Sequence, residues 1–232
     1  GDGAALTHRR LGIIDLSNAG RQPMFDPING NVIVFNGEIY NFRDVAEELA
    51  RLGQRLTTSS DTEVILAAYR QWGADCVHKL RGMFAFVLFD ARKRKALMAR
   101  DRLGIKPLYY AEVCGGDGQR VVLFASELRA LLGSGLVERK LSRQALSTYM
   151  WNGFVVGAQS IVEGVRLVSP GSRAMIDSQD PKVELERYWR LPPPADCTER
   201  STDRVREELR EAARLHLVSD VPVGVFLSGG ID

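Results

Sequence analysis

The sequence predicts an α+β protein, and three observations support this fold class. Several short runs are rich in β-branched and aromatic residues and are bounded by turn residues, as buried strands are. Other segments repeat apolar residues at helical spacing. The strand-like runs occur in neighbouring pairs joined by polar turns, which favours antiparallel hairpins. The chain has 232 residues, 45% hydrophobic and 26% charged, a composition typical of a globular protein.

The first predicted elements are a strand and a helix. The strand covers residues 31–36, NVIVFN, and the pair Asn36-Gly37 that ends it is the strongest short signal for a hairpin turn. The helix covers residues 42–52, with Asn41 as its candidate N-cap and Gly53 at the position where a helix commonly ends.

A second helix is predicted in the segment of residues 59–73. Ser60 and Glu63 have the spacing of a capping box, in which each side chain bonds a free backbone N–H of the first turn, and Gly73 closes the helix. Further strands and one weaker helix follow. The strands are expected at residues 83–90, 95–101, 107–113, 121–126, 172–176 and 182–189, and the helix at 142–150.

The composition changes near residue 191, where three consecutive prolines are followed by polar residues. Such a segment is extended and has little to bury, so it predicts a linker over residues 191–201. Residues 1–190 then form the main domain. Residues 202–232 begin a second one, with an amphipathic helix and an apolar strand that ends in Ser-Gly-Gly.

Charge and cysteine content exclude several classes of protein. The net charge is +2, which gives no field favouring nucleic acid or a membrane surface, and no apolar stretch is long enough to span a bilayer. The three cysteines are far apart, and neither they nor the three histidines have metal-ligand spacing. We therefore expect no metal site in this chain and a reducing, cytoplasmic location.

Four features are candidates for binding or catalysis, and each also has a structural interpretation. The closing SGGID is either a phosphate-binding loop or an ordinary turn. Asn36-Gly37 is either a pair of oxyanion donors or a hairpin turn. Arg10 is either a bidentate carboxylate clamp or a solvated arginine on an edge strand. Asp61 is either a ligand for a cation or a first-turn acid that complements the helix dipole.

Seven motifs occurring together resemble one family. In chain order they are HRRLGIIDLSNAGRQPM, NGEIYNF, SSDTEVILAAY, LRGMFAFVLFD, RDRLGIKPLYY, FASELRAL and SDVPVGVFLSGGID. Nearly the whole chain resembles the glutamine-dependent asparagine synthetases, whose glutaminase domain is a class II amidotransferase. The resemblance implies an N-terminal-nucleophile hydrolase fold, a four-layer α/β/β/α sandwich. The first helix and strand of an α/β synthetase domain would follow it.

The resemblance also implies an activity and its ligands. Glutamine hydrolysis supplies ammonia, and ATP with Mg²⁺ activates the side-chain carboxylate of aspartate as an adenylate. Ammonia then gives asparagine, AMP, pyrophosphate and glutamate. The implied partners are thus small molecules, with homodimerisation left open.

Family positions can be carried onto matching residues of this sequence. Arg10 resembles the clamp for the glutamine α-carboxylate, and Asp61 the acid that receives its α-ammonium group. Asn36 and Gly37 resemble the oxyanion hole, and Glu38 a further glutamine contact. The full set implied for glutamine is Arg10, Leu11, Ile13, Asn36, Gly37, Glu38 and Asp61. The set implied for ATP is Leu227, Ser228, Gly229, Gly230 and Asp232.

The sequence departs from the family pattern at both ends. Residue 1 is Gly, whereas the family nucleophile is an N-terminal cysteine, and the residues expected after Asp232 are missing. We therefore expect a fragment that is inactive by itself, since covalent catalysis needs the nucleophile. Two alternatives stay open. One is a related amidotransferase acting on another carboxylate, such as a sugar acid or a β-lactam precursor, and the other is a non-catalytic glutamine-binding module.

Overall fold

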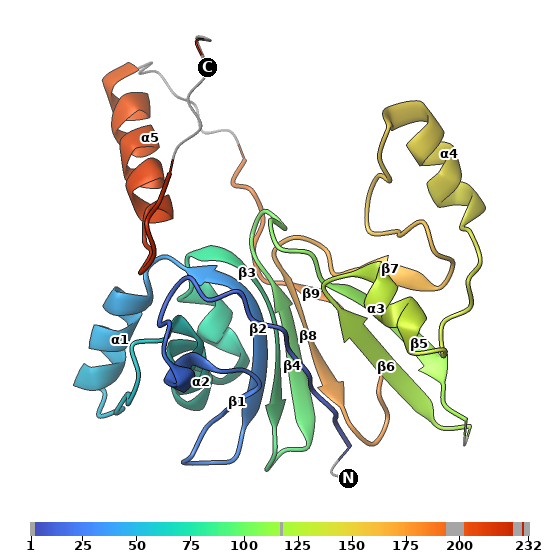
Figure 1. Cartoon of the computed structure of the whole chain (residues 1–232), viewed down its shortest axis with the longest axis horizontal. Helices are drawn as coiled ribbons and strands as arrows, with labels where there is room; N and C mark the ends of the chain where they lie inside the picture. The colour runs from blue at the N-terminus through green and yellow to red at the C-terminus, as the bar shows by residue number, and fades with distance from the viewer. Residues whose placement is uncertain (1–2, 117, 194–201, 225–228, 230–232) are drawn as a thin grey trace.

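The computed structural model describes residues 3–116, 118–193, 202–224 and 229, which form two antiparallel sheets with flanking helices (Figure 1). The larger sheet has the strand order β1-β2-β3-β4-β8-β9, and the smaller has the order β6-β5-β7. The strands of the larger sheet are β1 (Met24–Phe25), β2 (Val32–Ile39), β3 (Gly82–Asp90), β4 (Lys95–Arg100), β8 (Ser172–Asp177) and β9 (Glu186–Arg187). Those of the smaller sheet are β5 (Tyr109–Cys114), β6 (Arg120–Ala125) and β7 (Val165–Leu167).

Helices cover the outer faces of both sheets. Those on the larger sheet are α1 (Phe42–Arg51) and α2 (Asp61–Trp72), followed by the 3-10 helix Gly73–His78, and a second 3-10 helix spans Asn18–Gly20. The helices on the side of the smaller sheet are α3 (Leu128–Gly133) and α4 (Arg143–Asn152). The last helix, α5 (Thr202–His216), stands away from both sheets (Figure 1). The resulting layers are helix, sheet, sheet and helix, so the predicted α/β/β/α sandwich is confirmed.

Three hydrophobic cores lie between the four layers, and strand β3 shows how they are built. Its side chains alternate between the two faces of the sheet. Phe84, Phe86 and Leu88 belong to the core under α1 and α2, while Ala85 and Val87 belong to the core between the two sheets. A third core, which includes Ala111, Leu131 and Val165, joins the smaller sheet to α3. Because β3 is buried on both faces, its sequence is apolar throughout instead of alternating.

The predicted hairpins and most predicted helices are present, with some local corrections. The first strand does not end at Asn36-Gly37: β2 continues through this pair to Ile39, so the hairpin-turn interpretation is wrong. Asn41 makes no side-chain cap bond, because its amide bridges Lys79 O and Arg81 N of a neighbouring loop. Helix α3 was not predicted, and only Glu186–Arg187 of the strand expected at 182–189 is paired.

The C-terminal helix agrees with its prediction, since α5 spans Thr202–His216. Of the strand expected next, residues 221–224 are not in a sheet and residues 225–228 lie outside the described part of the chain. Residues 194–201 of the expected linker also lie outside it. No described helix is long and apolar enough to cross a membrane.

Candidate functional site

A cavity of about 730 Å³ opens beside strand β2, between the two sheets. It collects residues from the N-terminal segment, β2, β3, the start of α2 and the smaller sheet. All seven positions implied for glutamine line it: Arg10, Leu11, Ile13, Asn36, Gly37, Glu38 and Asp61. They are not equally enclosed, since Leu11 is 84% exposed and marks the rim, whereas Asp61 is 4% exposed. The volume is within the range of small-molecule sites.

Gly37 allows β2 to pass close to β3 at the cavity wall. Its φ is +145°, and a Cβ added there would lie 2.0 Å from the carbonyl oxygen of Met83 and 2.8 Å from the Cα of Phe84. Gly82, on the facing strand, is equally tight, because an added Cβ would lie 2.1 Å from Glu38 O. These contacts leave room for hydrogen atoms alone. Glycine is therefore required for this approach of the two strands, not for a turn.

Asn36, next to Gly37, has its side-chain amide in the cavity. Its Nδ2 donates to the Oγ of Ser126 at 3.2 Å, which connects the larger sheet to the segment after β6. An amide has two N–H donors, so one remains for a ligand. A side-chain amide beside a backbone N–H is the arrangement expected of oxyanion donors.

Asp61 is a buried carboxylate at the first position of α2. Its Oδ2 accepts a hydrogen bond from the backbone N–H of Ile39 at 3.1 Å. Burial raises the pKa of Asp61 to about 6, and the bond from Ile39 opposes the rise. Near neutral pH the group is therefore an anion with little solvent around it, which favours a cationic ligand.

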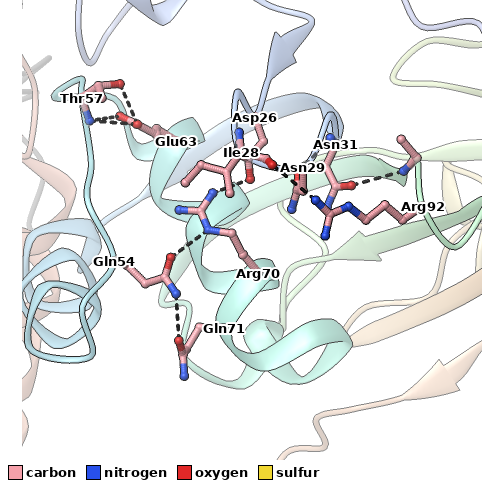
Figure 2. A network of polar contacts seen from close by, with 11 residues as sticks. Asp26, Ile28, Asn29, Asn31, Gln54, Thr57, Glu63, Arg70, Gln71 and Arg92 are labelled. Atoms are coloured by element: carbon pink, nitrogen blue, oxygen red, sulfur yellow. Dashed lines mark hydrogen bonds and ion pairs between the residues drawn. The ribbon is translucent and has the colours of Figure 1, made fainter.

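The start of α2 is held by a polar network around Glu63. Ser60 accepts from the N–H of Thr62, as an N-cap does. Glu63 does not bond Ser60 N–H, as a capping box requires, but accepts from the N–H and hydroxyl groups of Thr57 and Thr58. Figure 2 shows the Thr57 bonds and, further along α2, the bonds joining Arg70 to Asp26 and Gln54. This network anchors the turn that precedes Asp61.

Glu38 is a second buried carboxylate in the cavity. It is 7% exposed, and burial raises its pKa, while the nearby charges of Lys106 and His216 oppose the rise. Glu38 also contributes to the raised pKa of Asp61, so the two acids are electrostatically coupled. A ligand with a positive group would relieve this repulsion.

Arg10 is engaged by the loop that follows it. Its Nη2 donates to Ile14 O at 2.6 Å and to Asp15 O, and Nη1 donates to Ser17 O at 3.4 Å. Gly20 makes room for this arrangement, because an added Cβ would lie 2.5 Å from Nη2. A guanidinium can bind a carboxylate with two parallel hydrogen bonds through its Nε–Nη2 edge or its Nη1–Nη2 edge. Both edges need an Nη2 hydrogen, and both Nη2 hydrogens are already bonded to the loop. In this conformation Arg10 presents charge and single hydrogen bonds instead of the bidentate clamp that we expected.

The cavity also contains polar residues that the sequence did not single out, among them His8, Lys106 and Ser126. Lys106 lies in a loop shaped by two buried side chains. The Asp101 carboxylate accepts four backbone N–H bonds, from Phe84, Leu103, Ile105 and Lys106. Arg100 donates to the carbonyls of Gly104, Lys106 and Val168 at 2.6 to 2.7 Å. The sequence did contain a signal for the loop that carries Lys106, namely the pair Arg100-Asp101 shortly before Gly104.

The cysteines and the ATP positions lie elsewhere. No cysteine lines the cavity in the described part of the chain: Cys76 is buried in the core beneath α1 and α2, and Cys114 is exposed at the end of β5. Of the ATP positions only Gly229 is described, and it is exposed. The others, Leu227, Ser228, Gly230 and Asp232, lie outside the described residues. Among the described residues no group of His, Cys, Asp and Glu has the arrangement of a metal site.

Two family models match the chain. The model of the glutamine amidotransferase domain matches residues 1–189, which include the whole cavity. The model of asparagine synthase matches residues 204–232, which include most of α5 and the closing SGGID.

Curated relatives resemble the chain over almost its full length. It is 36% identical over 230 residues to asparagine synthetase [glutamine-hydrolyzing] 3 of Bacillus subtilis (strain 168), covering 97% of this chain and 36% of the relative. It is 38% identical over 233 residues to amidase chry2 of Gibberella zeae, covering 98% of this chain and 33% of the relative. The chain thus spans about a third of the length of these relatives.

A solved structure supports the fold. Glutamine phosphoribosylpyrophosphate amidotransferase from Bacillus subtilis superposes with a TM-score of 0.51 at 20% identity, covering 75% of this chain and 33% of the other. At that identity the likeness concerns the fold alone.

Proposed function

This chain belongs to the glutamine amidotransferase domain family, and on that premise we propose that its cavity binds L-glutamine. The observation that carries the proposal is that side chains of opposite charge line the same cavity. Arg10 contributes a guanidinium, and Asp61 and Glu38 contribute two buried carboxylates. An α-amino acid has a carboxylate and an ammonium group at one end, so such a site holds it at both charges.

In the proposed complex the glutamine side chain reaches Asn36 and Gly37. Arg10 attracts the α-carboxylate, while Asp61 and Glu38 receive the α-ammonium group. The free Nδ2 hydrogen of Asn36 and the N–H of Gly37 then face the amide carbonyl, where a tetrahedral oxyanion would form on attack. Leu11 and Ile13 cover the aliphatic part of the ligand from the rim.

We propose that this chain binds glutamine without hydrolysing it. Amide hydrolysis in this family proceeds through a cysteine nucleophile, and none of the described cysteines lies in the cavity. For a protein as long as these relatives, the role we propose for this domain is to supply ammonia for the ATP-dependent, Mg²⁺-dependent amidation of aspartate, in the cytoplasm. Two findings support this role: the asparagine synthase model matches residues 204–232, and the B. subtilis relative is named as a glutamine-hydrolysing asparagine synthetase.

A second candidate differs only in the acceptor. The fungal relative named as an amidase is as similar to this chain as the asparagine synthetases are. The residues of the glutamine cavity say nothing about which carboxylate is amidated. Supplying a protein that joins this domain to a complete synthetase domain with glutamine, ATP and a panel of carboxylates would separate the two. If the first candidate is correct, aspartate should be the one carboxylate of the panel that yields product.

Isothermal titration of this chain with L-glutamine tests the proposed binding. We expect saturable binding of L-glutamine and little binding of glutaramate, which lacks the α-ammonium group, or of 4-aminobutyramide, which lacks the carboxylate. Asp61→Ala should abolish binding, and the exposed Asp75→Ala, a matched control, should leave it unchanged. Equal affinity for all three compounds would contradict the two-charge site, and glutamate release above a buffer blank would contradict the proposed inactivity.

A further inference from the structure

The chain that follows α5 returns to the loop carrying Arg10. Two hydrogen bonds join them: Asp220 N–H donates to Ile13 O at 2.9 Å, and the N–H of Asp15 donates to Asp220 Oδ2 at 2.7 Å. Asp220 thus bonds both ends of the segment Ile13–Asp15, one end through its backbone N–H and the other through its side chain. In Figure 1 the segment after α5 reaches down toward the N-terminal part of the chain.

The segment Ile13–Asp15, which Asp220 bonds, also orients the side chain of Arg10. Its guanidinium donates to the Ile14 carbonyl, in the peptide unit whose N–H bonds Asp220, and to the Asp15 carbonyl, in the next unit. Asp15 has a φ of +52°, which is uncommon for a non-glycine residue and needs surrounding contacts to persist. Within the loop, the Asp15 carboxylate accepts from Ser17 N–H and Oγ. From outside the loop, the Ser59 side chain bonds the Asp15 carboxylate and Asp220 bonds the Asp15 backbone N–H.

The segment around Asp220 is itself anchored. Val218 packs against the core beneath α1 and α2. The ring of His216 lies 4.6 Å from that of Tyr40, directly after β2, the strand that carries Asn36, Gly37 and Glu38. The rest of α5 has no buried residue, so the contact with the sandwich is concentrated at residues 216–220.

We infer that Asp220 is a positioning residue for glutamine, which holds the Ile13–Asp15 backbone in the form that orients Arg10 toward the cavity. The inference rests on the proposed function of that cavity. Asp220 lies in the part matched by the asparagine synthase model, whereas Arg10 lies in the part matched by the glutamine amidotransferase model. The contact therefore couples the two parts: displacing residues 218–220 weakens glutamine binding, and by linkage bound glutamine stabilises that segment.

Two variants of this chain test the role. Asp220→Ala removes the acceptor for Asp15 N–H, and Asp220→Asn keeps an oxygen acceptor without the charge. We expect Asp220→Ala to weaken glutamine binding about tenfold by titration calorimetry, the size of one hydrogen bond to a charged group. Asp220→Asn should restore most of the affinity. Asp203→Ala, on the exposed first turn of α5, is the matched control and should bind as the unchanged chain does.

Amide hydrogen exchange of residues 10–17 gives a second readout. Asp220→Ala should exchange faster in this segment, and the glutamine-induced protection of residues 216–220 should disappear. The inference would be overturned if Asp220→Ala left both the glutamine affinity and the amide exchange rate unchanged. It would also be overturned if Asp220→Asn lost as much glutamine affinity as Asp220→Ala does. If the unchanged chain fails to bind glutamine, the proposed function fails, and the exchange of residues 10–17 still decides whether Asp220 holds the loop.

Discussion

Asp61 and Ile39 are joined by a hydrogen bond in which the Asp61 carboxylate accepts the last free N–H of strand β2 at 3.1 Å. The bond ties the first residue of α2 to the strand that carries Asn36 and Gly37. It also aims a buried carboxylate into the cavity, beside Glu38. The acid is thereby both a part of the fold and a group for binding a cation, and its two roles respond to pH in opposite ways.

Glutamine binding should weaken as the pH falls through about 6. Burial raises the pKa of Asp61 to about 6, so below that value the group is increasingly protonated and no longer attracts the α-ammonium group. The raised pKa of Glu38 acts in the same direction. Calorimetric titrations between pH 5 and pH 8 measure the effect. An affinity that is constant over this range would contradict the assignment of Asp61 to the ammonium group.

The stability of the fold should show the reverse dependence. The pKa of Asp61 is higher in the folded state than its ordinary value of 3.8, so ionisation destabilises the fold as the pH rises from about 4 to above 6. Asp61→Asn should therefore stabilise the protein above pH 6 by at most about 3 kcal/mol, and not below pH 4. Urea unfolding at the two pH values checks this. Asp203→Asn, on the exposed face of α5, should change stability at neither.

Gly37→Ala should destabilise the fold by about 3 kcal/mol or more. Its Cβ would lie 2.0 Å from Met83 O, which is backbone in a central strand and cannot rotate away, and its φ of +145° is unfavourable for alanine. Gly116→Ala is a suitable control, because nothing lies within 4 Å of its added Cβ. Thermal unfolding of both variants compares them, and equal melting temperatures would mean that β2 and β3 separate more easily than their spacing indicates.

Asp101→Asn should destabilise the loop that carries Lys106. Each carboxylate oxygen of Asp101 accepts two backbone N–H groups. The NH₂ group of asparagine would face two of those donors, at a cost of about 3 kcal/mol. Asp177→Asn removes an exposed ion pair with Lys95 and should cost less than about 1 kcal/mol. Urea unfolding of both variants tests the difference, which would vanish if the loop reorganised around the amide.

Much of the architecture could be predicted from local sequence. The apolar runs of β3 and β4, the N-cap Ser60 and C-cap Gly73 of α2, and the hairpin of β5 and β6 appear where expected, because they depend on neighbours within a few residues. The capping-box partner Glu63 does not, since it bonds Thr57 and Thr58. The set of residues proposed for glutamine was likewise available from motifs. Their meeting in one cavity was not, because it depends on how β2, α2 and the N-terminal segment pack.

The tertiary structure alone decided the features that arise from distant partners. Asn36-Gly37 has the local pattern of a turn, yet pairing with Ala85 and Phe84 in β3 keeps it in a strand. Arg10 has the chemistry of a bidentate clamp, yet loop carbonyls occupy part of its guanidinium. Asp220 has no visible role in sequence, because the residues it bonds lie 205 and more positions away. Local sequence specifies conformational preference, whereas burial and hydrogen-bond partners are set only once distant segments meet.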